Sequence, residues 1–465
     1  MDGQITRREV LKKGLIGAAG LTALPAVLAA CSSSSATPTP APTSAPATQA
    51  PATQAPATAA PVSGTVHVGS NHSDASDVKG MTAIDTAFAA AYPQVNLVLN
   101  TVDHATFQDQ INNYLTTTPD DVFCWFSGFR MRFFASKGLA TAIDDVWANV
   151  KSNYTAGFTT AVTGDDGKVY AIPVDYYPWA VFYSKSLFSD KGYTVPTTFA
   201  DLLTLCDKMK ADGITPIAFA DKDGWPAMGT FDILNLRTNG YDFHVGLMTG
   251  AQKWTDSKVT DVFNTWKKLI PYYTSGFSGL TWEQACDTLV KKQAGMYLLG
   301  LFLTGEIDTV DSTGAAKKDT DFFTFPYMGN SYDAEKSLDA PIDVMMMSAK
   351  SQTLQADLGP SKAYLDFWAK GSTQLLMYQA NNGFIPTASD VDTTKLDTLT
   401  QKAVQLVSQA QKITQFLDRD SRPDFAGSNG MQSFLLDFLQ NPNQDLAAFQ
   451  KKIQDFWDAL PAYNG

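Results

Sequence analysis

A continuous apolar run at residues 121–126 is the feature of this chain that most restricts its fold. A run without polar alternation is typical of a strand that is buried on both faces of a parallel sheet. Further runs with strand character occupy residues 65–69 and 95–99. Helical patterns lie between them, one over about residues 77–92 and one that follows Asp103, its predicted N-cap. This alternation of strand and helix predicts a doubly wound α/β lobe.

The rest of the chain is long enough for a second lobe. Strands are predicted at residues 180–183 and 216–220, with a helix between them, and again at 295–299 and 344–347, while the last hundred or so residues are mainly helical. The body from about Gly64 to the end of the chain has roughly 400 residues, which exceeds a usual single core. Two lobes are therefore expected.

The first 31 residues predict export and lipidation. Arg7 and Arg8 form a twin-arginine signal, and the apolar stretch 14–30 behind them ends at Cys31 in a pattern similar to a bacterial lipobox. This stretch is short and rich in small residues, whereas a membrane span needs about 20 strongly apolar ones. We interpret residues 1–31 as an export signal and expect Cys31 to be lipidated. The ordinary secretory route stays open as an alternative to the twin-arginine route.

The segment after Cys31 is predicted to be a tether. Residues 32–62 contain only Ser, Ala, Thr, Pro, Gln and one Val, with no charge and no aromatic ring. Such a segment has nothing to bury and cannot offset the entropy lost when it becomes ordered. We therefore expect a disordered linker over residues 32–63, which would leave the folded body on the outer face of the cytoplasmic membrane.

Composition excludes several function classes. The net charge of −12 and the pI near 4.8 argue against binding to nucleic acid or to an anionic membrane surface. Besides Cys31, the chain has Cys124, Cys206 and Cys286, without the spacing of metal ligands or of a disulfide scaffold, and the four histidines are dispersed. Cys206 lies on the apolar stripe of a predicted helix and is expected to be buried. We expect no metal and no cofactor.

Three ordered motifs carry a resemblance to a known family. Residues 121–128 and 138–139 resemble the third-strand region of the extracellular solute-binding proteins of ABC transporters, in their sugar-binding group. Residues 167–173, followed by 183–185, resemble the first crossing between the lobes of those proteins. Residues 295–302 resemble their return crossing. The spacing is similar to that of maltose/maltodextrin-binding proteins, and the similarity covers nearly the whole body.

The resemblance implies a periplasmic-binding-protein-like fold with two α/β lobes, a hinge and a sugar in the cleft between the lobes. It implies a first lobe of residues 64–172 plus 296–345 and a second, helix-rich lobe of residues 173–295 plus 346–465. Gly128 stands where maltose-binding proteins carry a ligand-binding acid, so the resemblance does not specify maltose. Carried over by position, the residues expected to contact the ligand are Trp125, Ser127, Asp175, Tyr177, Trp225 and Phe302.

The residue chemistry itself also suits a sugar, because a pyranose offers an apolar C–H face to aromatic rings and hydroxyls to polar groups. Asn71 follows the first strand, at the edge where open parallel sheets bind ligands. Trp179 and Trp282 are further candidate contacts, although either ring could instead fill a core. Asp343 lies in an apolar run, so its carboxylate needs a partner, either a ligand or an internal hydrogen-bond network. The charged run 417–424 has the composition of a solvated surface segment, with a place in the cleft as the alternative.

These features together predict a substrate-binding lipoprotein of an ABC importer, which captures a mono- or oligosaccharide and delivers it to a membrane permease without catalysis. Nucleic acid is not an expected partner, and a monomer is expected. A secreted glycosidase is an alternative, since it needs two carboxylates facing each other across a cleft, and Asp175 and Asp343 could imitate that pair. A sugar sensor that docks to a receptor kinase is a third possibility.

Overall fold

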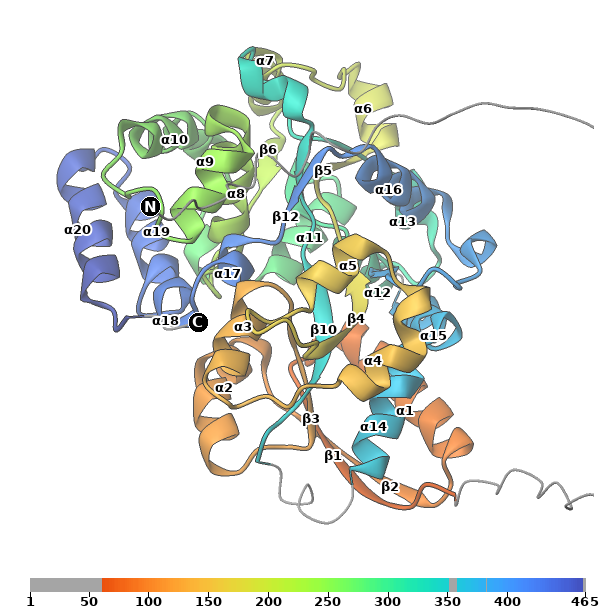
Figure 1. Ribbon diagram of the computed structural model, residues 1–465. Helices are drawn as coiled ribbons and strands as arrows, with labels where there is room; N and C mark the ends of the chain where they lie inside the picture. Colours follow the sequence, from red (N-terminus) through yellow and green to blue (C-terminus); the bar gives the residue numbers. More distant parts are fainter. Residues whose placement is uncertain (1–60, 351–357, 382, 463–465) are drawn as a thin grey trace, which may run out of the picture. The chain divides into compact units, whose positions relative to one another are not determined.

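Two β-sheets organise the part of the chain that the structure, a computed structural model, describes: residues 61–350, 358–381 and 383–462. The expected export signal, Cys31 and almost all of the linker lie outside these residues. We call the larger sheet with its helices the first lobe and the smaller sheet with its helices the second lobe (Figure 1). Within the described residues, no helix has the length and apolar character that crossing a membrane requires.

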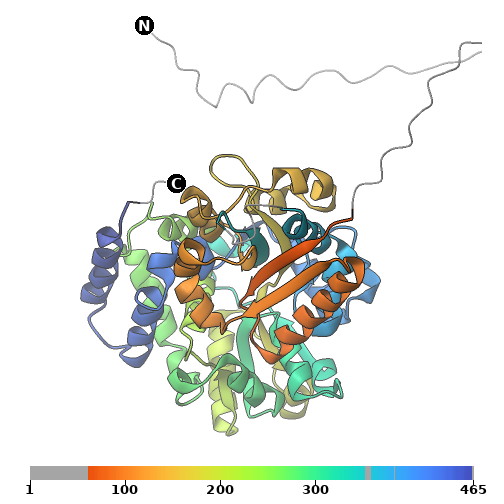
Figure 2. The ribbon, with the colours of Figure 1, turned by 90° about the horizontal axis from the view of Figure 1, so that it is seen from below.

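The first lobe is built on a six-stranded sheet with the order β11-β4-β10-β3-β1-β2. β1 runs parallel to both β2 and β3, as the sequence predicts, and the first two lie side by side in Figure 2. β10 runs antiparallel to β3 and β4, so the sheet is mixed. The strands are β1 (Gly64–Ser70), β2 (Val95–Thr101), β3 (Val122–Phe126), β4 (Ala171–Tyr176), β10 (Ile342–Met347) and β11 (Ile385–Pro386).

Helices cover this sheet and place their N-termini near its edge. The predicted cap of the second helix is confirmed, because the Asp103 side chain accepts a hydrogen bond from the backbone N–H of Thr106 at 3.0 Å. α1 packs against α15 over a long contact, although the two helices are far apart in sequence. The helices are α1 (Ala75–Ala91), α2 (His104–Thr117), α3 (Phe129–Ser136), α4 (Asp144–Val150), α5 (Ala156–Ala161), α14 (Gly359–Trp368) and α15 (Gly371–Asn381).

The second lobe has a four-stranded sheet with the order β6-β7-β5-β8. Its strands are β5 (Trp179–Ser184), β6 (Thr215–Ala218), β7 (Ala294–Gly300) and β8 (Thr320–Phe323). Its helices up to β8 are α6 (Lys185–Lys191), α7 (Phe199–Ala211), α8 (Trp225–Asn239), α9 (Tyr241–Met248), α10 (Ser257–Lys267), α11 (Trp282–Val290), α12 (Leu303–Val310) and α13 (Ala315–Asp319).

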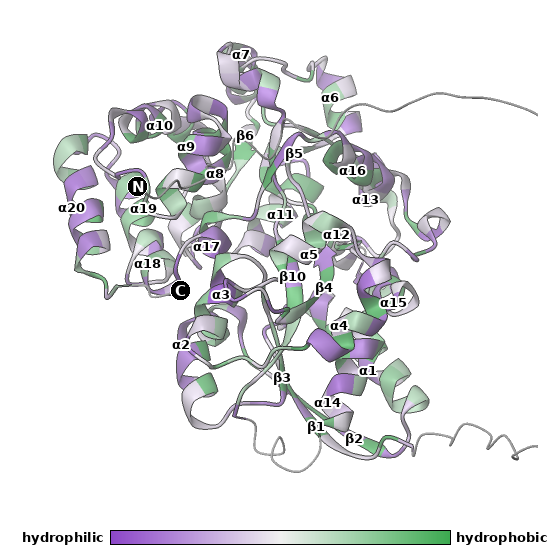
Figure 3. Cartoon of the chain, in the orientation of Figure 1, coloured by the Kyte–Doolittle hydropathy of each residue, from purple (hydrophilic) through white to green (hydrophobic). Residues whose placement is uncertain are grey.

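The last hundred or so residues are mainly helical, as the sequence predicts, and their described part includes the short strands β11 and β12. β12 (Lys412–Thr414) pairs in parallel with β9 (Ser337–Asp339) and forms a separate two-stranded sheet beside α8. The helices after β11 are α16 (Thr398–Gln409), α17 (Leu417–Asp420), α18 (Pro423–Ala426), α19 (Met431–Gln440) and α20 (Leu446–Ala459). Green and purple residues both occur along α20 in Figure 3, as expected of a helix that buries one face only.

Sheet membership differs from the predicted division of the chain. Residues 296–345 were expected in the first lobe, but β7 and β8 pair with β5 in the second sheet, and only β10 joins the first. Residues 346–465 were expected in the second lobe, but α15 packs on α1, and β11 pairs with β4. The reason is physical: an apolar run is equally able to join either sheet, and long-range pairing decides which one it joins.

The first crossing between the sheets also comes later than predicted. β4 continues through residue 176, and β5 begins at residue 179, so the chain crosses at Tyr177 and Pro178 rather than near residues 172–173. The chain returns between Asp339 and Ile342, immediately before β10. Both crossings place residues beside the boundary between the lobes, where the candidate site lies.

The core contains the three cysteines of the described residues and one helix, α8, that is packed on almost all sides. Cys206 is buried on α7, as predicted, and Cys124 and Cys286 are also buried and free. α8 is buried around almost its whole circumference, because α10, α17 and α19 all pack against it. A helix fixed on all sides holds its first residue, Trp225, in a defined place.

Candidate functional site

A pocket of about 180 Å³ lies between the two lobes and takes its lining from both. The first lobe contributes residues that follow β1 and β2, together with Asp343 on β10. The second lobe contributes the start of α8, the start of α11 and the residue after β7. Seven of the ten predicted contacts line this pocket: Asn71, Tyr177, Trp179, Trp225, Trp282, Phe302 and Asp343.

Aromatic rings form one wall of the pocket. Trp225 packs edge to face against Trp179, Trp282 and Phe302, with ring centroids 6.3, 6.4 and 5.7 Å apart. Tyr177 meets Phe302 at 5.1 Å, also edge to face. Trp179, Trp282 and Tyr177 are buried, whereas Trp225 and Phe302 keep part of their surface exposed. These two rings are therefore available to stack against a ligand.

Local backbone geometry fixes the position of Trp225. Gly224 has φ +75°, and a Cβ at this position would lie 2.7 Å from the Cβ of Gln432, so the turn requires glycine. Pro226 follows in the first turn of α8, where its missing N–H costs nothing. The Asp221 carboxylate accepts from the backbone N–H of Ala227 at 2.9 Å. Together these contacts hold the first turn of α8 at the pocket.

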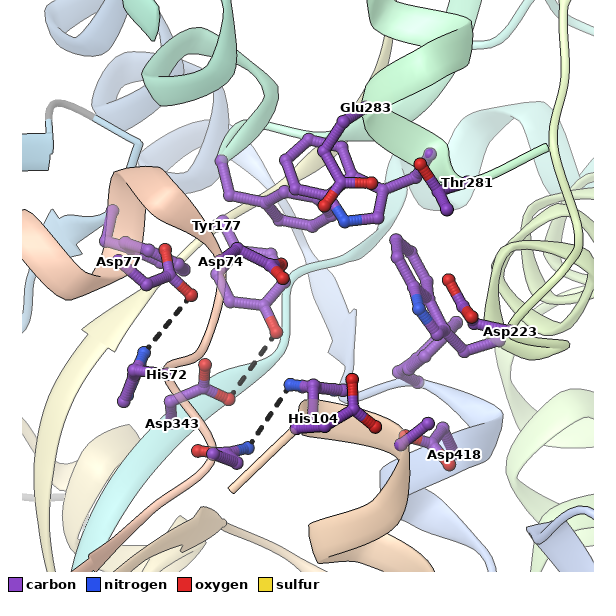
Figure 4. Close-up of a pocket in the computed structure, with 18 of the residues that line it drawn as sticks. His72, Asp74, Asp77, His104, Tyr177, Asp223, Thr281, Glu283, Asp343 and Asp418 are labelled. Atoms are coloured by element: carbon purple, nitrogen blue, oxygen red, sulfur yellow. Dashed lines mark hydrogen bonds and ion pairs between the residues drawn. The ribbon is translucent and has the colours of Figure 1, made fainter. Parts of the chain in front are cut away.

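Polar groups gather opposite the rings around Asp343. The hydroxyl of Tyr177 donates to Oδ1 of Asp343 at 3.4 Å (Figure 4). Nη2 of Arg419 lies at the same distance from that oxygen. The Arg419 guanidinium also stacks on the ring of Phe126, 3.8 Å from its centroid. Burial raises the pKa of Asp343, and the charge of Arg419 opposes this rise. The pocket thus offers both donors and acceptors.

Three predicted contacts lie outside the pocket lining. Trp125 is 1% exposed and packs in the core against Phe126 and Phe134, with ring centroids 4.9 and 5.4 Å apart. Ser127 is buried and donates to Oε1 of Gln415 at 2.7 Å, which ties the end of β3 to the segment before α17. Trp125 therefore contributes to core packing and Ser127 to a hydrogen bond inside the protein.

Asp175 is the third predicted contact that does not line the pocket. It is 3% exposed and is the partner of Asp343 across the antiparallel pair β4 and β10. Burial, followed by the charge of Asp343, raises the pKa of Asp175 well above its ordinary value. Asp175 therefore lies beside the site, next to Asp343, without lining the pocket.

The pocket also includes charged and aromatic residues that the sequence did not single out. The segments after β1 and β2 could have been found by the reasoning that selected Asn71, since they follow the carboxyl ends of parallel strands. For the segment 417–424 the sequence left a solvated surface run and a part of the cleft both open, and only its distant partners decide between them. The missed residues are His72, Asp74, Asp77, Asp103, His104, Ala105, Lys222, Asp223, Thr281, Glu283, Phe384, Phe416, Asp418 and Arg419.

Carboxylates crowd one end of the pocket. Asp77 pairs with His72, whose Nδ1 lies 3.3 Å from Oδ2 (Figure 4). Asp74 is flanked by Asp77 and Glu283, and a hydrogen bond from the Trp282 side chain and the neighbouring His72 only partly offset their charges. Burial, together with the charges of Asp77 and Glu283, raises the pKa of Asp74 to about 7. When Asp74 is ionised, like charges therefore repel one another at this end of the pocket.

This crowding predicts a pH-dependent stability. The pKa of Asp74 is raised from 3.8 to about 7 in the folded protein. The contribution of protonated Asp74 to the free energy of unfolding is therefore fully present below pH 3.8 and is lost as the pH rises through 7. We expect Asp74→Asn to be more stable than the parent protein at pH 8 by roughly 1–2 kcal/mol, and the difference to shrink toward pH 4. Urea denaturation at the two pH values measures this. The exposed Asp190→Asn serves as control, and an Asp74→Asn protein without a pH-dependent difference would refute the prediction.

The chain is similar to known solute-binding proteins. The family model for bacterial extracellular solute-binding proteins matches residues 73–373. An uncharacterized ABC transporter extracellular-binding protein of Pyrococcus horikoshii is 24% identical over 301 residues, which cover 64% of this chain and 65% of the relative. A probable sugar-binding periplasmic protein of Mesorhizobium japonicum is 29% identical over 169 residues, 35% of this chain and 39% of the relative. The matches thus span less than two thirds of these curated relatives.

A solved structure matches over a larger share. The bacterial solute receptor AcbH, described with an exclusive preference for β-D-galactopyranose, is 36% identical and superposes with a TM-score of 0.79. The match covers 85% of this chain and 98% of that receptor. The likeness confirms the predicted two-lobed α/β fold.

Proposed function

Because the chain belongs to the family of bacterial extracellular solute-binding proteins, we propose that it captures a sugar in the interlobe pocket and delivers it to the membrane subunits of an ABC importer. The observation that supports this proposal most strongly is that both lobes supply residues to the lining of the pocket. Partly exposed rings come from the second lobe, and Asp343 and Asn71 come from the first. A ligand that contacts both sides favours the closed arrangement of the lobes, since only there are all contacts made.

The chemistry of the pocket matches a pyranose. Trp225 and Phe302 offer ring surface for the C–H face of a sugar, while Asp343 accepts and Arg419 donates hydrogen bonds to hydroxyls. Pockets for drug-sized ligands occupy roughly 300–1,000 Å³. A volume of about 180 Å³ is smaller, which favours a single sugar ring. The described preference of AcbH supports D-galactose as the first sugar to test.

A glycosidase is less compatible with the arrangement of the carboxylates. Asp175 and Asp343 lie opposite each other on the neighbouring strands β4 and β10 of one sheet. Two carboxylates of a glycosidase flank the scissile bond from different sides and lie about 5–9 Å apart. Side chains on one sheet face do not provide that arrangement, and we propose binding without catalysis.

Titration with sugars tests this function. The chain from residue 60 onward forms a compact unit with its own contacts and can be studied without its N-terminal segment. A sugar present at 100 times its dissociation constant stabilises the folded state by about 2.7 kcal/mol. We expect a rise in melting temperature with D-galactose or a closely related monosaccharide. If no sugar in a panel of monosaccharides and oligosaccharides changes the melting temperature, the proposed function is wrong.

We further propose that lipidation at Cys31 holds the protein on the outer face of the cytoplasmic membrane, and that it acts as a monomer. Cys31→Ser is expected to move the protein from the membrane fraction to the soluble fraction, because a single thiol carries the lipid. Sugar affinity should stay unchanged, since roughly thirty residues separate Cys31 from β1. Membrane fractionation and calorimetry measure the two quantities. A variant that still sediments with membranes would contradict the proposed anchor.

A further inference from the structure

A chain of hydrogen bonds connects one lining residue of the pocket, Asp418, with another, Asn71, through buried side chains. It begins at Asp418, which is 1% exposed and pairs with Nη2 of the buried Arg130. Nη1 of Arg130 donates to Oε1 of Gln108 at 3.0 Å. A guanidinium only donates hydrogen bonds, so the atom of Gln108 that faces Arg130 must be its oxygen. The amide of Gln108 therefore has one defined orientation.

The orientation of Gln108 determines the protonation of His104. With Oε1 turned to Arg130, Nε2 of Gln108 lies 2.7 Å from Nε2 of His104 and donates to it. A neutral imidazole has one N–H group and one accepting nitrogen, so the proton of His104 belongs on Nδ1. Burial, assisted by the charge of Arg419, lowers the pKa of His104 to about 4, which keeps the ring neutral at pH 7.

His104, which itself lines the pocket, in turn faces Asn71, another lining residue. Nδ1 of His104 lies 3.4 Å from Nδ2 of Asn71, joined by a dashed line in Figure 4. Two N–H donors cannot form a hydrogen bond with each other. A half turn of the amide exchanges its oxygen and nitrogen, which have nearly the same size, and resolves this conflict.

We propose that His104 is held as the Nδ1–H tautomer, that it donates to the side-chain oxygen of Asn71, and that the NH₂ group of Asn71 consequently faces the pocket as a donor to a sugar oxygen. Gln108 and Arg130 are then positioning residues, which act on the ligand only through His104 and Asn71. The role of Asn71 toward a sugar rests on the proposed function. The tautomer of His104 does not.

The tautomer can be measured without any sugar. The full-length protein, labelled with ¹⁵N in its histidines, contains four imidazole rings, and the signals of His104 are assigned by their loss in His104→Gln. At pH 7 we expect a protonated Nδ1 and an unprotonated Nε2 for His104. A proton on Nε2 would overturn the proposal, whether or not the protein binds sugar. Absence of sugar binding to the parent protein would instead refute the proposed function and leave the tautomer result standing.

Variants test the link from Gln108 to the ligand. Gln108→Met keeps the length of the side chain and removes the donor to His104, so we expect the affinity for D-galactose, or for the sugar that titration identifies, to fall roughly three- to tenfold. Asn71→Asp still accepts from His104 but has no NH₂ group, and we expect a loss of similar size. Gln110→Met, an exposed position on the same helix, is the matched control and should leave the affinity unchanged.

Combining the two changes separates positioning from a general effect on the fold. If Gln108 acts through Asn71, Gln108→Met should add little to the loss already caused by Asn71→Asp. Melting temperatures without sugar establish that each variant is folded. If the fold-losses of sugar affinity multiply in the double variant, or if the affinity of Gln108→Met is unchanged, the proposed series of hydrogen bonds is wrong.

Discussion

Asp418→Ala is expected to lower the free energy of unfolding by about 3–5 kcal/mol, the scale of breaking a buried ion pair. Arg130, its partner, is 2% exposed and lies against the rings of Trp125 and Phe126, 5.5 and 5.6 Å from their centroids. The substitution leaves a buried guanidinium with Gln108 as its remaining hydrogen-bond acceptor among the described contacts. Urea denaturation, monitored by circular dichroism, measures the loss.

An exposed ion pair provides the control for this prediction. Asp455 pairs with Lys451 one helical turn away on α20, and both side chains are more than half exposed. Asp455→Ala should therefore cost less than about 1 kcal/mol. Replacing both buried partners, as in Arg130→Met with Asp418→Leu, should restore part of the stability, because no unpaired charge then remains buried. Equal losses for Asp418→Ala and Asp455→Ala would contradict the assigned burial.

Trp225→Ala is expected to weaken sugar binding by roughly 1–3 kcal/mol, the range for an aromatic contact that is buried on binding. The ring is partly exposed in the pocket, so its loss should change the stability of the sugar-free protein less than it changes the affinity. Isothermal titration calorimetry measures the affinity, and thermal unfolding without sugar measures the stability.

Trp457→Ala is the matched control for Trp225→Ala. Trp457 is also a partly exposed tryptophan, but it packs on Phe425 at 4.6 Å in the C-terminal helices and does not line the pocket. Its loss should reduce stability and leave the sugar affinity unchanged. If Trp225→Ala instead lowers stability alone, its ring belongs to the core and not to the binding surface.

The sequence predicted elements well where hydrophobic periodicity is strong. The apolar run ending at Phe126 is a strand with both faces buried, and Asp103 caps the helix after β2. These features depend on neighbours within a few residues, which a sequence displays directly.

Pairings between distant segments could not be predicted in the same way. The run that became β7 has the composition of a strand in either sheet, and only its ladder with β5 places it in the second. Trp125 carries the ring expected of a sugar contact, but it packs in the core against Phe134. Arg419 lies in a charged run whose partner, Asp343, is 76 residues away in sequence.

A crystal structure of the protein with a saturating sugar tests the central claim most directly. We expect the sugar to occupy the pocket between the lobes, with one ring face on Trp225 or Phe302 and hydroxyls within hydrogen-bonding distance of Asp343 and Asn71. A sugar found instead in the wider groove beside Arg130 and Gln432, or on the outer surface of either lobe, would contradict the account.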